Sequence, residues 1–289
     1  MRFGIKTAPM NTTWGDMLDV WREADDIEVF ETAWNFDHFE PIYSDRSGPC
    51  LEGWSMLAAM AAHTQRLRLG CMVTGMPYRH PSLLANMAAT IDIISGGRLI
   101  IGLGAGWNQE ESDALGLAMP PLKTRFDQFD EGIQVIVGLL RDERTTFEGQ
   151  HFQVREAWCE PKPIQRPHPP IAIGGNGEKR TLRAVARWAQ HWNSSLPDVD
   201  EWMRKRDVLH AHCADVGRDP AEIECSVNLR FDHDVGVGAV VARAEKWSAA
   251  GVDVGIVSMS VPHTPSVLGP LAEALSPLAS LSVNDGRRR

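Results

Sequence analysis

Short apolar segments alternate with longer amphipathic segments along most of this chain. Apolar runs at 2–8, 28–36, 67–73 and 98–103 predict strands, and apolar positions with a helical period predict helices at 16–26, 52–63 and 81–94. The alternation returns later, with predicted strands at 171–173, 191–195, 222–230 and 252–259 and predicted helices at 178–190, 199–216, 237–250 and 265–281. Eight strands that alternate with helices indicate a parallel sheet covered by helices. The strands are almost continuously apolar, as expected for strands buried on both faces.

Residues 107–169 interrupt this alternation. They contain a short helix after Asn108, a long helix at 123–141, and two short strands joined by a turn at Glu148-Gly149. Five prolines within 160–170 predict an extended connector. We therefore expect one (β/α)8-barrel domain over residues 1–289, with an insertion between strands 4 and 5 that helps to roof the substrate cavity. The last residues, 282–289, are expected to form a disordered tail.

An open, doubly wound sheet is the alternative fold for this pattern. Its usual signature is GxGxxG directly after the first strand. Here the first strand runs into Thr7-Ala8-Pro9-Met10, which contains no glycine, and the glycines at 102–106 follow the fourth strand without the full spacing. The barrel is the favoured prediction.

Composition and charge narrow the possible partners. The formal net charge of -9 argues against sequence-independent nucleic-acid binding, which requires cationic side chains to neutralise phosphates. The five cysteines are widely spaced and form no CxxC motif, a pattern typical of a reducing compartment. The chain shows no signal-peptide pattern at its start and no apolar run near the roughly 20 residues of a membrane span. We expect a cytoplasmic protein without membrane contact.

The segment Gly174-Gly175-Asn176-Gly177 follows a predicted strand and precedes a predicted helix. Glycine brings bare backbone close to a ligand, and the free N–H groups of a first helical turn attract anions. A tight turn with nothing bound would also explain the glycines. Three glycines within four residues exceed what such a turn requires, which favours a phosphate site.

Other polar or small residues follow the second, third and fourth strands: Asp37-His38, Thr74-Gly75, and the run from Gly104 to Asn108. Each of these alone is also typical of an ordinary strand-to-loop junction. In a barrel, however, the carboxyl ends of all strands meet at one rim, where active sites lie. The four segments together therefore indicate one site with room for a flat, bulky ligand.

Several other chemistries have no motif here. The sequence contains no HExxH, no GxSxG and no GxxxxGK[ST]. Its one His-x-His spacing, His210 and His212, lies in a predicted helix, where residues two apart occupy different faces. No metal site is predicted.

Taken together, these segments resemble the luciferase-like monooxygenase superfamily, most closely its coenzyme F420-dependent branch. The resemblance rests on WNFDHF at 34–39, on RLRLGCMVTG and RHPSLLANMAATIDIISGGRLIIGLGAGWN within 66–108, and on IGGNGEKRTLRAVARWAQHWN at 173–193. It extends from residue 1 to about 281. It implies a (β/α)8 barrel with a flavin or an 8-hydroxy-5-deazaflavin at its carboxyl-terminal mouth.

The resemblance also implies roles for individual residues. Asp37 and His38 match a pair that flanks the deazaflavin ring, and Val73-Thr74-Gly75 matches a bulge, often with a non-prolyl cis peptide bond, that backs the ring. Asn108, with Gly106 beside it, matches a polar cofactor contact, and Gly174, Gly175, Asn176, Gly177 and Glu178 match the loop on the phosphate side. Relatives form dimers through the helices that correspond to 52–63 and 81–94, so a homodimer is expected.

The function implied is an F420-dependent oxidoreductase that transfers hydride to or from a small organic substrate, with His38 as a ring contact or proton relay. Sugar-phosphate dehydrogenases of this superfamily carry a catalytic Glu where this chain has Ala105, so that activity is not expected. Two alternatives stay open: an FMN-dependent, two-component monooxygenase, and a flavin-binding protein without turnover. The sequence does not identify the substrate.

Overall fold

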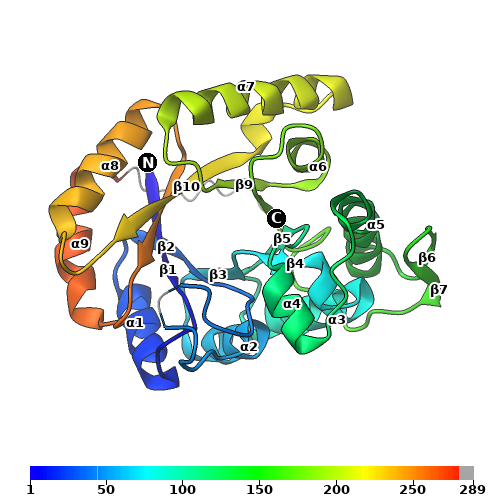
Figure 1. Ribbon diagram of the computed structural model, residues 1–289, viewed down its shortest axis with the longest axis horizontal. Helices are drawn as coiled ribbons and strands as arrows, with labels where there is room; N and C mark the ends of the chain where they lie inside the picture. Colours follow the sequence, from blue (N-terminus) through cyan, green and yellow to red (C-terminus); the bar gives the residue numbers. More distant parts are fainter. Residues whose placement is uncertain (44, 280–289) are drawn as a thin grey trace.

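Eight parallel strand units close into a barrel in the computed structural model, which describes residues 1–43 and 45–279 (Figure 1). The units are β1 (Arg2–Thr7), β2 (Phe30–Asn35), β3 (Arg68–Cys71) with β4 (Thr74–Gly75), β5 (Leu99–Gly104), β8 (Ile171–Gly174), β9 (His191–Ser194), β10 (Glu224–Phe231) and β11 (Val254–Met259). β1 pairs with both β2 and β11, and the pairing of β3 with β5 closes the ring. The predicted barrel is confirmed, and an open sheet is excluded. The expected tail at 282–289 lies outside the described residues.

The helices that follow the strands surround the barrel on its outside (Figure 1). They are α1 (Trp14–Asp26), α2 (Gly53–His63), α3 (Pro81–Ile94), α5 (Leu122–Arg141), α6 (Thr181–Trp188), α7 (Val199–Val216), α8 (Val237–Ala249) and α9 (Leu268–Leu275). α1 begins two residues before its predicted start, because the Thr13 hydroxyl accepts a hydrogen bond from the Asp16 N–H while the Asp16 carboxylate accepts one from the Thr13 N–H.

The helix predicted from residue 178 begins only at Thr181, so this boundary was wrong by three residues. Two side chains in the intervening turn are held by neighbouring helices. The Glu178 carboxylate accepts hydrogen bonds from Arg204 and Lys205 of α7, and Arg180 donates to carboxylates of α5. These contacts hold 178–180 as a turn, which separates the Gly174–Gly177 loop from the helix.

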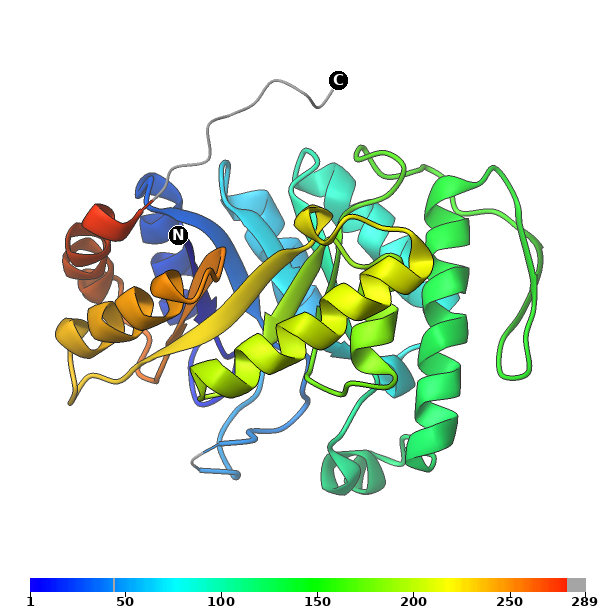
Figure 2. The same cartoon turned by 90° about the horizontal axis from the view of Figure 1, so that it is seen from above.

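The predicted excursion between strands 4 and 5 is present. It consists of α4 (Gln109–Leu115), α5, and the antiparallel hairpin of β6 (Thr145–Glu148) and β7 (Gln153–Ala157). The hairpin projects beyond α5, away from the barrel (Figures 1 and 2). The carboxylate of Glu131 on α5 anchors it by accepting hydrogen bonds from three backbone N–H groups at 150–152. The excursion was expected to help roof the cavity; its α5 segment does contribute lining residues there, but the hairpin does not.

The interior of the barrel is filled by a separate apolar cluster. Its six members come from five strands or strand junctions: Trp34, Met72, Ile100, Ala172, Val254 and Ile256. Toward the carboxyl ends of the strands, polar side chains such as Lys6 and Asn228 replace this apolar layer. The apolar plug therefore forms a closed floor, and the polar layer above it faces a cavity at the mouth.

Candidate active site

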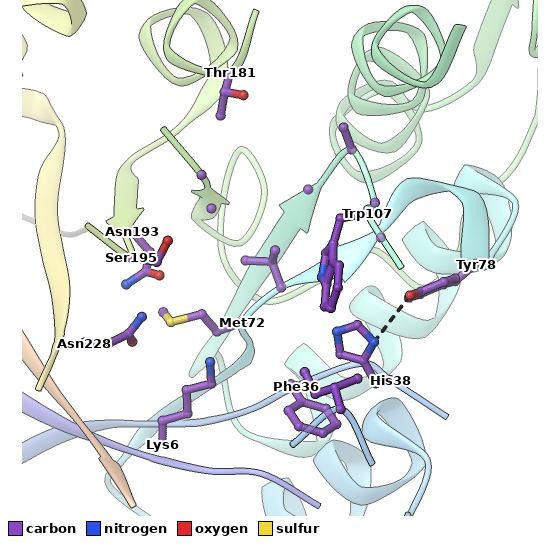
Figure 3. A pocket seen from close by; sticks show the side chains of 18 of the residues that line it. Lys6, Phe36, His38, Met72, Tyr78, Trp107, Thr181, Asn193, Ser195 and Asn228 are labelled. Atoms are coloured by element: carbon purple, nitrogen blue, oxygen red, sulfur yellow. Dashed lines mark hydrogen bonds between the residues drawn. The ribbon is translucent and has the colours of Figure 1, made fainter. Parts of the chain in front are cut away.

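A cavity of about 420 Å³ opens at the carboxyl-terminal mouth of the barrel (Figure 3). Half of the predicted site residues line it: His38, Val73, Gly75, Gly106, Gly174 and Gly175. The other predicted residues, Asp37, Thr74, Asn108, Asn176, Gly177 and Glu178, are not among its lining residues. The structure thus brings the four strand-end segments to one rim, as the barrel topology requires.

His38 lies at one end of the cavity and is held by a buried carboxylate. Its Nδ1 atom is 2.8 Å from Oε2 of Glu111, a fully buried residue of α4. The same carboxylate accepts a 2.6 Å hydrogen bond from the Tyr78 hydroxyl and a 2.6 Å bond from the Phe39 N–H. Sequence reasoning missed both Glu111 and Tyr78.

Glu111 is ionised in this setting. Burial alone would raise the pKa of its carboxyl, but hydrogen bonds from His38, Tyr78 and the Phe39 N–H outweigh burial and lower the pKa to about 2. Burial and the hydrogen bond to Glu111 together raise the pKa of the Tyr78 hydroxyl, which keeps it protonated as a donor. An ionised acceptor at Nδ1 fixes the imidazole with its proton on Nδ1 and leaves Nε2 as the free ring nitrogen.

Figure 3 shows how the His38 ring is placed. The dashed line from Tyr78 reaches one ring nitrogen, and the second nitrogen lies on the opposite side of the ring, toward Met72. The rings of Phe36 and Trp107 contact His38 edge to face, with centroids 5.1 and 5.4 Å away. This aromatic enclosure leaves Nε2 as the polar atom that His38 presents to the cavity.

Asp37, the other member of the predicted pair, points elsewhere. Its carboxylate is fully buried and forms an ion pair with Arg79, which also pairs with Glu52 at the start of α2. Burial raises the pKa of Asp37, although the Arg79 charge opposes this shift. The Asp37–Arg79 pair ties β2 to the segment before α3, so in this structure Asp37 braces the wall behind His38.

The predicted bulge after β3 is present, and its Met72–Val73 peptide bond is cis. Val73 lines the cavity, whereas Thr74 is buried and its hydroxyl accepts a 2.7 Å hydrogen bond from the Trp54 indole N–H. Two glycines of neighbouring strands pack against Val73: a Cβ atom on Gly104 would lie 2.9 Å from its side chain, and one on Gly174 would lie 3.1 Å away. Glycines at these positions leave the wall around Val73 flat.

The segment after β5 serves both the wall and Glu111. Gly106 adopts a positive φ of 83°, which glycine tolerates, and Ala105 lines the cavity. The Asn108 side chain accepts a 3.3 Å hydrogen bond from the Glu111 N–H and thereby caps α4. Asn108 therefore positions the helix that carries Glu111.

In the loop after β8, Gly174 and Gly175 form part of the cavity wall, and Gly175 has a φ of 117°. The Asn176 side chain is bound to the next strand end, accepting from the Ser194 hydroxyl at 2.7 Å and donating to the Ser195 hydroxyl at 3.3 Å. Gly177 lies against Thr181, the first residue of α6, whose backbone carries no side-chain cap. The loop exposes backbone toward the cavity, which suits an anionic group.

The opposite end of the cavity is polar. Lys6 at the end of β1, Asn193 of β9 and Asn228 of β10 line it (Figure 3). Burial lowers the pKa of the Lys6 ammonium. The sequence contained one signal for Lys6, a charged residue near the carboxyl end of a mostly buried strand.

No group of three or more His, Cys, Asp or Glu side chains within 1–43 and 45–279 is arranged to hold a metal ion. In the same part of the chain, no helix is both long and apolar enough to cross a bilayer. His210 is exposed on α7 and His212 bonds to a backbone carbonyl, in keeping with their prediction as surface residues.

Comparison with known proteins places this geometry in a family. Residues 1–254 match the family described as luciferase-like monooxygenase. An F420-dependent glucose-6-phosphate dehydrogenase of Kineococcus radiotolerans is 30% identical over 280 residues, covering 95% of this chain and 80% of that protein. An uncharacterised protein of Mycobacterium tuberculosis is 34% identical over 157 residues, about half the length of each protein.

Among solved structures, an F420-dependent secondary alcohol dehydrogenase in complex with an F420-acetone adduct superimposes with a TM-score of 0.86. The match covers 96% of this chain and 99% of that one at 17% identity, and so supports the fold alone. The family match covers residues 1–254, which is most of the chain. The barrel and the bulge after β3 are consistent with this match. The chain belongs to the luciferase-like monooxygenase family.

Proposed function

We propose that this chain is an F420-dependent oxidoreductase that transfers hydride between a deazaflavin and a small organic substrate. The observation that carries the proposal is the His38 imidazole, which faces the cavity beside the Val73 bulge and is fixed from behind by the ionised Glu111. Relatives named as F420-dependent dehydrogenases support the choice of cofactor.

The residues present fit a flat tricyclic ring. Gly104 and Gly174 lie next to Val73 and leave the space beside it empty. A Cβ atom at Gly104 would be 2.9 Å and one at Gly174 would be 3.1 Å from the Val73 side chain, which is closer than ordinary van der Waals contact. Val73 and Gly75 would hold the ring, and the backbone of Gly174 and Gly175 would meet the anionic end of the cofactor. Trp107 is 63% exposed at the mouth and covers His38, where it would help to exclude water.

When bound, the deazaflavin supplies or accepts the hydride. Reduction of a carbonyl also needs one proton, and oxidation of an alcohol releases one. His38 carries that proton at Nε2, because Nδ1 is engaged by Glu111. Glu111 cannot itself act as the acid near neutral pH, since its pKa is about 2. It is a positioning residue that holds the orientation of the His38 ring.

The substrate is a small organic molecule other than a sugar phosphate. Ala105 brings only a methyl group to the cavity wall, and the neighbouring lining residues Trp107, Leu122 and Phe126 are apolar. This end of the cavity suits a ketone, aldehyde or alcohol with an apolar body.

An FMN-dependent monooxygenase would use the same flat wall, and a flavin carrier would need no His38. Anaerobic mixing of the protein with reduced F420 and a panel of ketones and aldehydes separates these functions. Reoxidation of F420 without oxygen supports the proposal. In a separate aerobic assay, oxygen-dependent conversion of a substrate with reduced FMN identifies a monooxygenase. The absence of turnover with both cofactors leaves a carrier.

A further inference from the structure

The polar end of the cavity contains three side chains that take no part in the proposed proton relay. The side chain of Lys6 projects from β1 into the cavity, and the amides of Asn193 and Asn228 lie beside it, on the far side of Met72 from His38 (Figure 3). The three residues come from β1, β9 and β10. β9 and β10 are neighbours in the barrel, and β11 alone separates β10 from β1. The barrel itself, and no mobile loop, fixes their relative positions.

Within the described residues, Lys6 forms no hydrogen bond and no ion pair with a carboxylate. Other partly buried cations of this protein are matched: Arg79 pairs with Asp37 and Glu52, and Arg180 pairs with two aspartates of α5. The titratable neighbour of Lys6 is the Cys71 thiol, which supplies no counter-charge because burial raises its pKa and keeps it protonated. Lys6 is half-buried on the cavity wall, so its ammonium has lost part of its hydration and gained no counter-charge. A ligand that supplies a counter-charge is therefore favoured at this position.

The two amides support the same conclusion. Asn193 donates one N–H to the Ser226 hydroxyl at 2.9 Å, which fixes its orientation. The Oδ1 atom of Asn228 is buried and accepts no hydrogen bond from the described residues. An unsatisfied Oδ1 atom needs a hydrogen-bond donor, so it does not itself favour an anion. The groups of the two amides that can serve an anionic oxygen are their Nδ2 N–H donors, of which Asn193 uses one toward Ser226.

We propose that Lys6, Asn193 and Asn228 form a subsite for an anionic oxygen at the inner end of the cavity. Two sources offer this chemistry: a carboxylate on the substrate, and the electron-rich pyrimidine oxygens of a reduced cofactor ring. Only the second source rests on the proposed function. In either case Lys6 supplies the charge, and the amides supply hydrogen bonds that set the direction of the oxygen.

The first arm of the test uses no cofactor. 4-Fluorobenzoate is titrated into the protein and followed by fluorine NMR, with 4-fluorobenzamide as the neutral analogue. The variants are Lys6→Met, which keeps the side-chain length without the charge, and Lys6→Arg, which keeps the charge. Lys246→Met, at an exposed position of α8, is the control for net charge. A carboxylate source predicts that Lys6→Met weakens benzoate binding at least tenfold, while Lys6→Arg and Lys246→Met change it little.

The second arm compares the dissociation constants of oxidised and reduced F420 for the same proteins. A cofactor source predicts that Lys6→Met weakens the reduced form about tenfold more than the oxidised form. The thermal midpoint of Lys6→Met should be no lower than that of the wild type, which shows that the variant is folded. If benzoate binding and the ratio of the F420 constants are both unchanged in Lys6→Met, the subsite does not exist. Failure of the wild type to bind F420 or FMN overturns the proposed function, while the benzoate arm still decides on the subsite.

Discussion

The imidazole of His38 and the carboxylate of Glu111 are 73 residues apart in sequence and 2.8 Å apart in space. The contact joins the end of β2 to α4, the first helix of the excursion. This contact determines which ring nitrogen of His38 faces the cavity. Because Glu111 belongs to the excursion, the excursion contributes directly to the candidate active site.

Replacement of His38 should abolish turnover and spare cofactor binding. We expect His38→Gln to lower kcat by about 10²–10⁴-fold, the usual contribution of a positioned proton-transfer group. The F420 dissociation constant should stay within about threefold, because the backbone and Val73 form most of the wall. His210→Gln, at an exposed histidine of α7, is the matched control. Full activity of His38→Gln would contradict the proposed role of His38 in proton transfer.

The substitution Glu111→Gln should lower the free energy of unfolding, because it removes the ionised carboxylate. The buried amide keeps the shape but loses charged hydrogen bonds, at a cost of about 1–3 kcal/mol in the free energy of unfolding near pH 7. The pKa of Glu111 is about 2 in the folded protein against 4.5 without interactions, so its contribution is complete above pH 4.5 and disappears as the pH falls toward 2.

Chemical denaturation between pH 7 and the lowest pH at which the protein stays folded measures this effect. The wild type should lose more stability below pH 4.5 than Glu111→Gln does. Glu110→Gln, at the adjacent and largely exposed position of α4, should retain the acid sensitivity of the wild type. Parallel curves for wild type and Glu111→Gln would show that the carboxylate carries no such role.

Filling the flat wall should weaken cofactor binding. In Gly174→Ala the new methyl group would lie 3.1 Å from Val73, and the valine would be pushed toward the ring. We expect the F420 dissociation constant to rise about tenfold, which corresponds to about 1.4 kcal/mol. Gly238→Ala in α8, where a Cβ meets nothing within 4 Å, should leave binding unchanged. The double variant Val73→Ala/Gly174→Ala should recover part of the affinity; an unaltered constant in Gly174→Ala would contradict the placement of the ring.

Glucose 6-phosphate should not be a substrate, although a 30% identical relative is named for that activity. Ala105 lines the cavity and offers no ionisable group. With F420 and about 5 mM sugar phosphate, a concentration several times the upper end of typical KM values, the absorbance of oxidised F420 should stay constant. A steady loss of absorbance that depends on the protein would show that another residue replaces the missing Glu.

The sequence predicted the barrel well because its signals are local. Continuous apolar strands, helical periods and glycine at strand ends report directly on burial and turns, and topology alone then brings the strand ends together. The resemblance added the bulge at Val73, where the cis peptide bond is present.

Contacts between distant segments could not be predicted in this way. Nothing in the local pattern of Glu111 distinguishes it from its exposed neighbour Glu110, since only the packing of α4 against β2 buries one of them. The ion pair of Asp37 with Arg79, 42 residues further along the chain, was likewise not predicted. The start of α6 was wrong because ion pairs to α5 and α7, which no local propensity encodes, hold 178–180 as a turn.

The central claim, that the cavity holds a deazaflavin, is tested most directly by fluorescence titration of the purified protein with oxidised F420 and with FMN side by side. The account predicts saturable binding of F420 at micromolar or lower concentration, at least tenfold tighter than FMN, which corresponds to about 1.4 kcal/mol or more. Tighter binding of FMN, or no saturable binding of either cofactor, would contradict it.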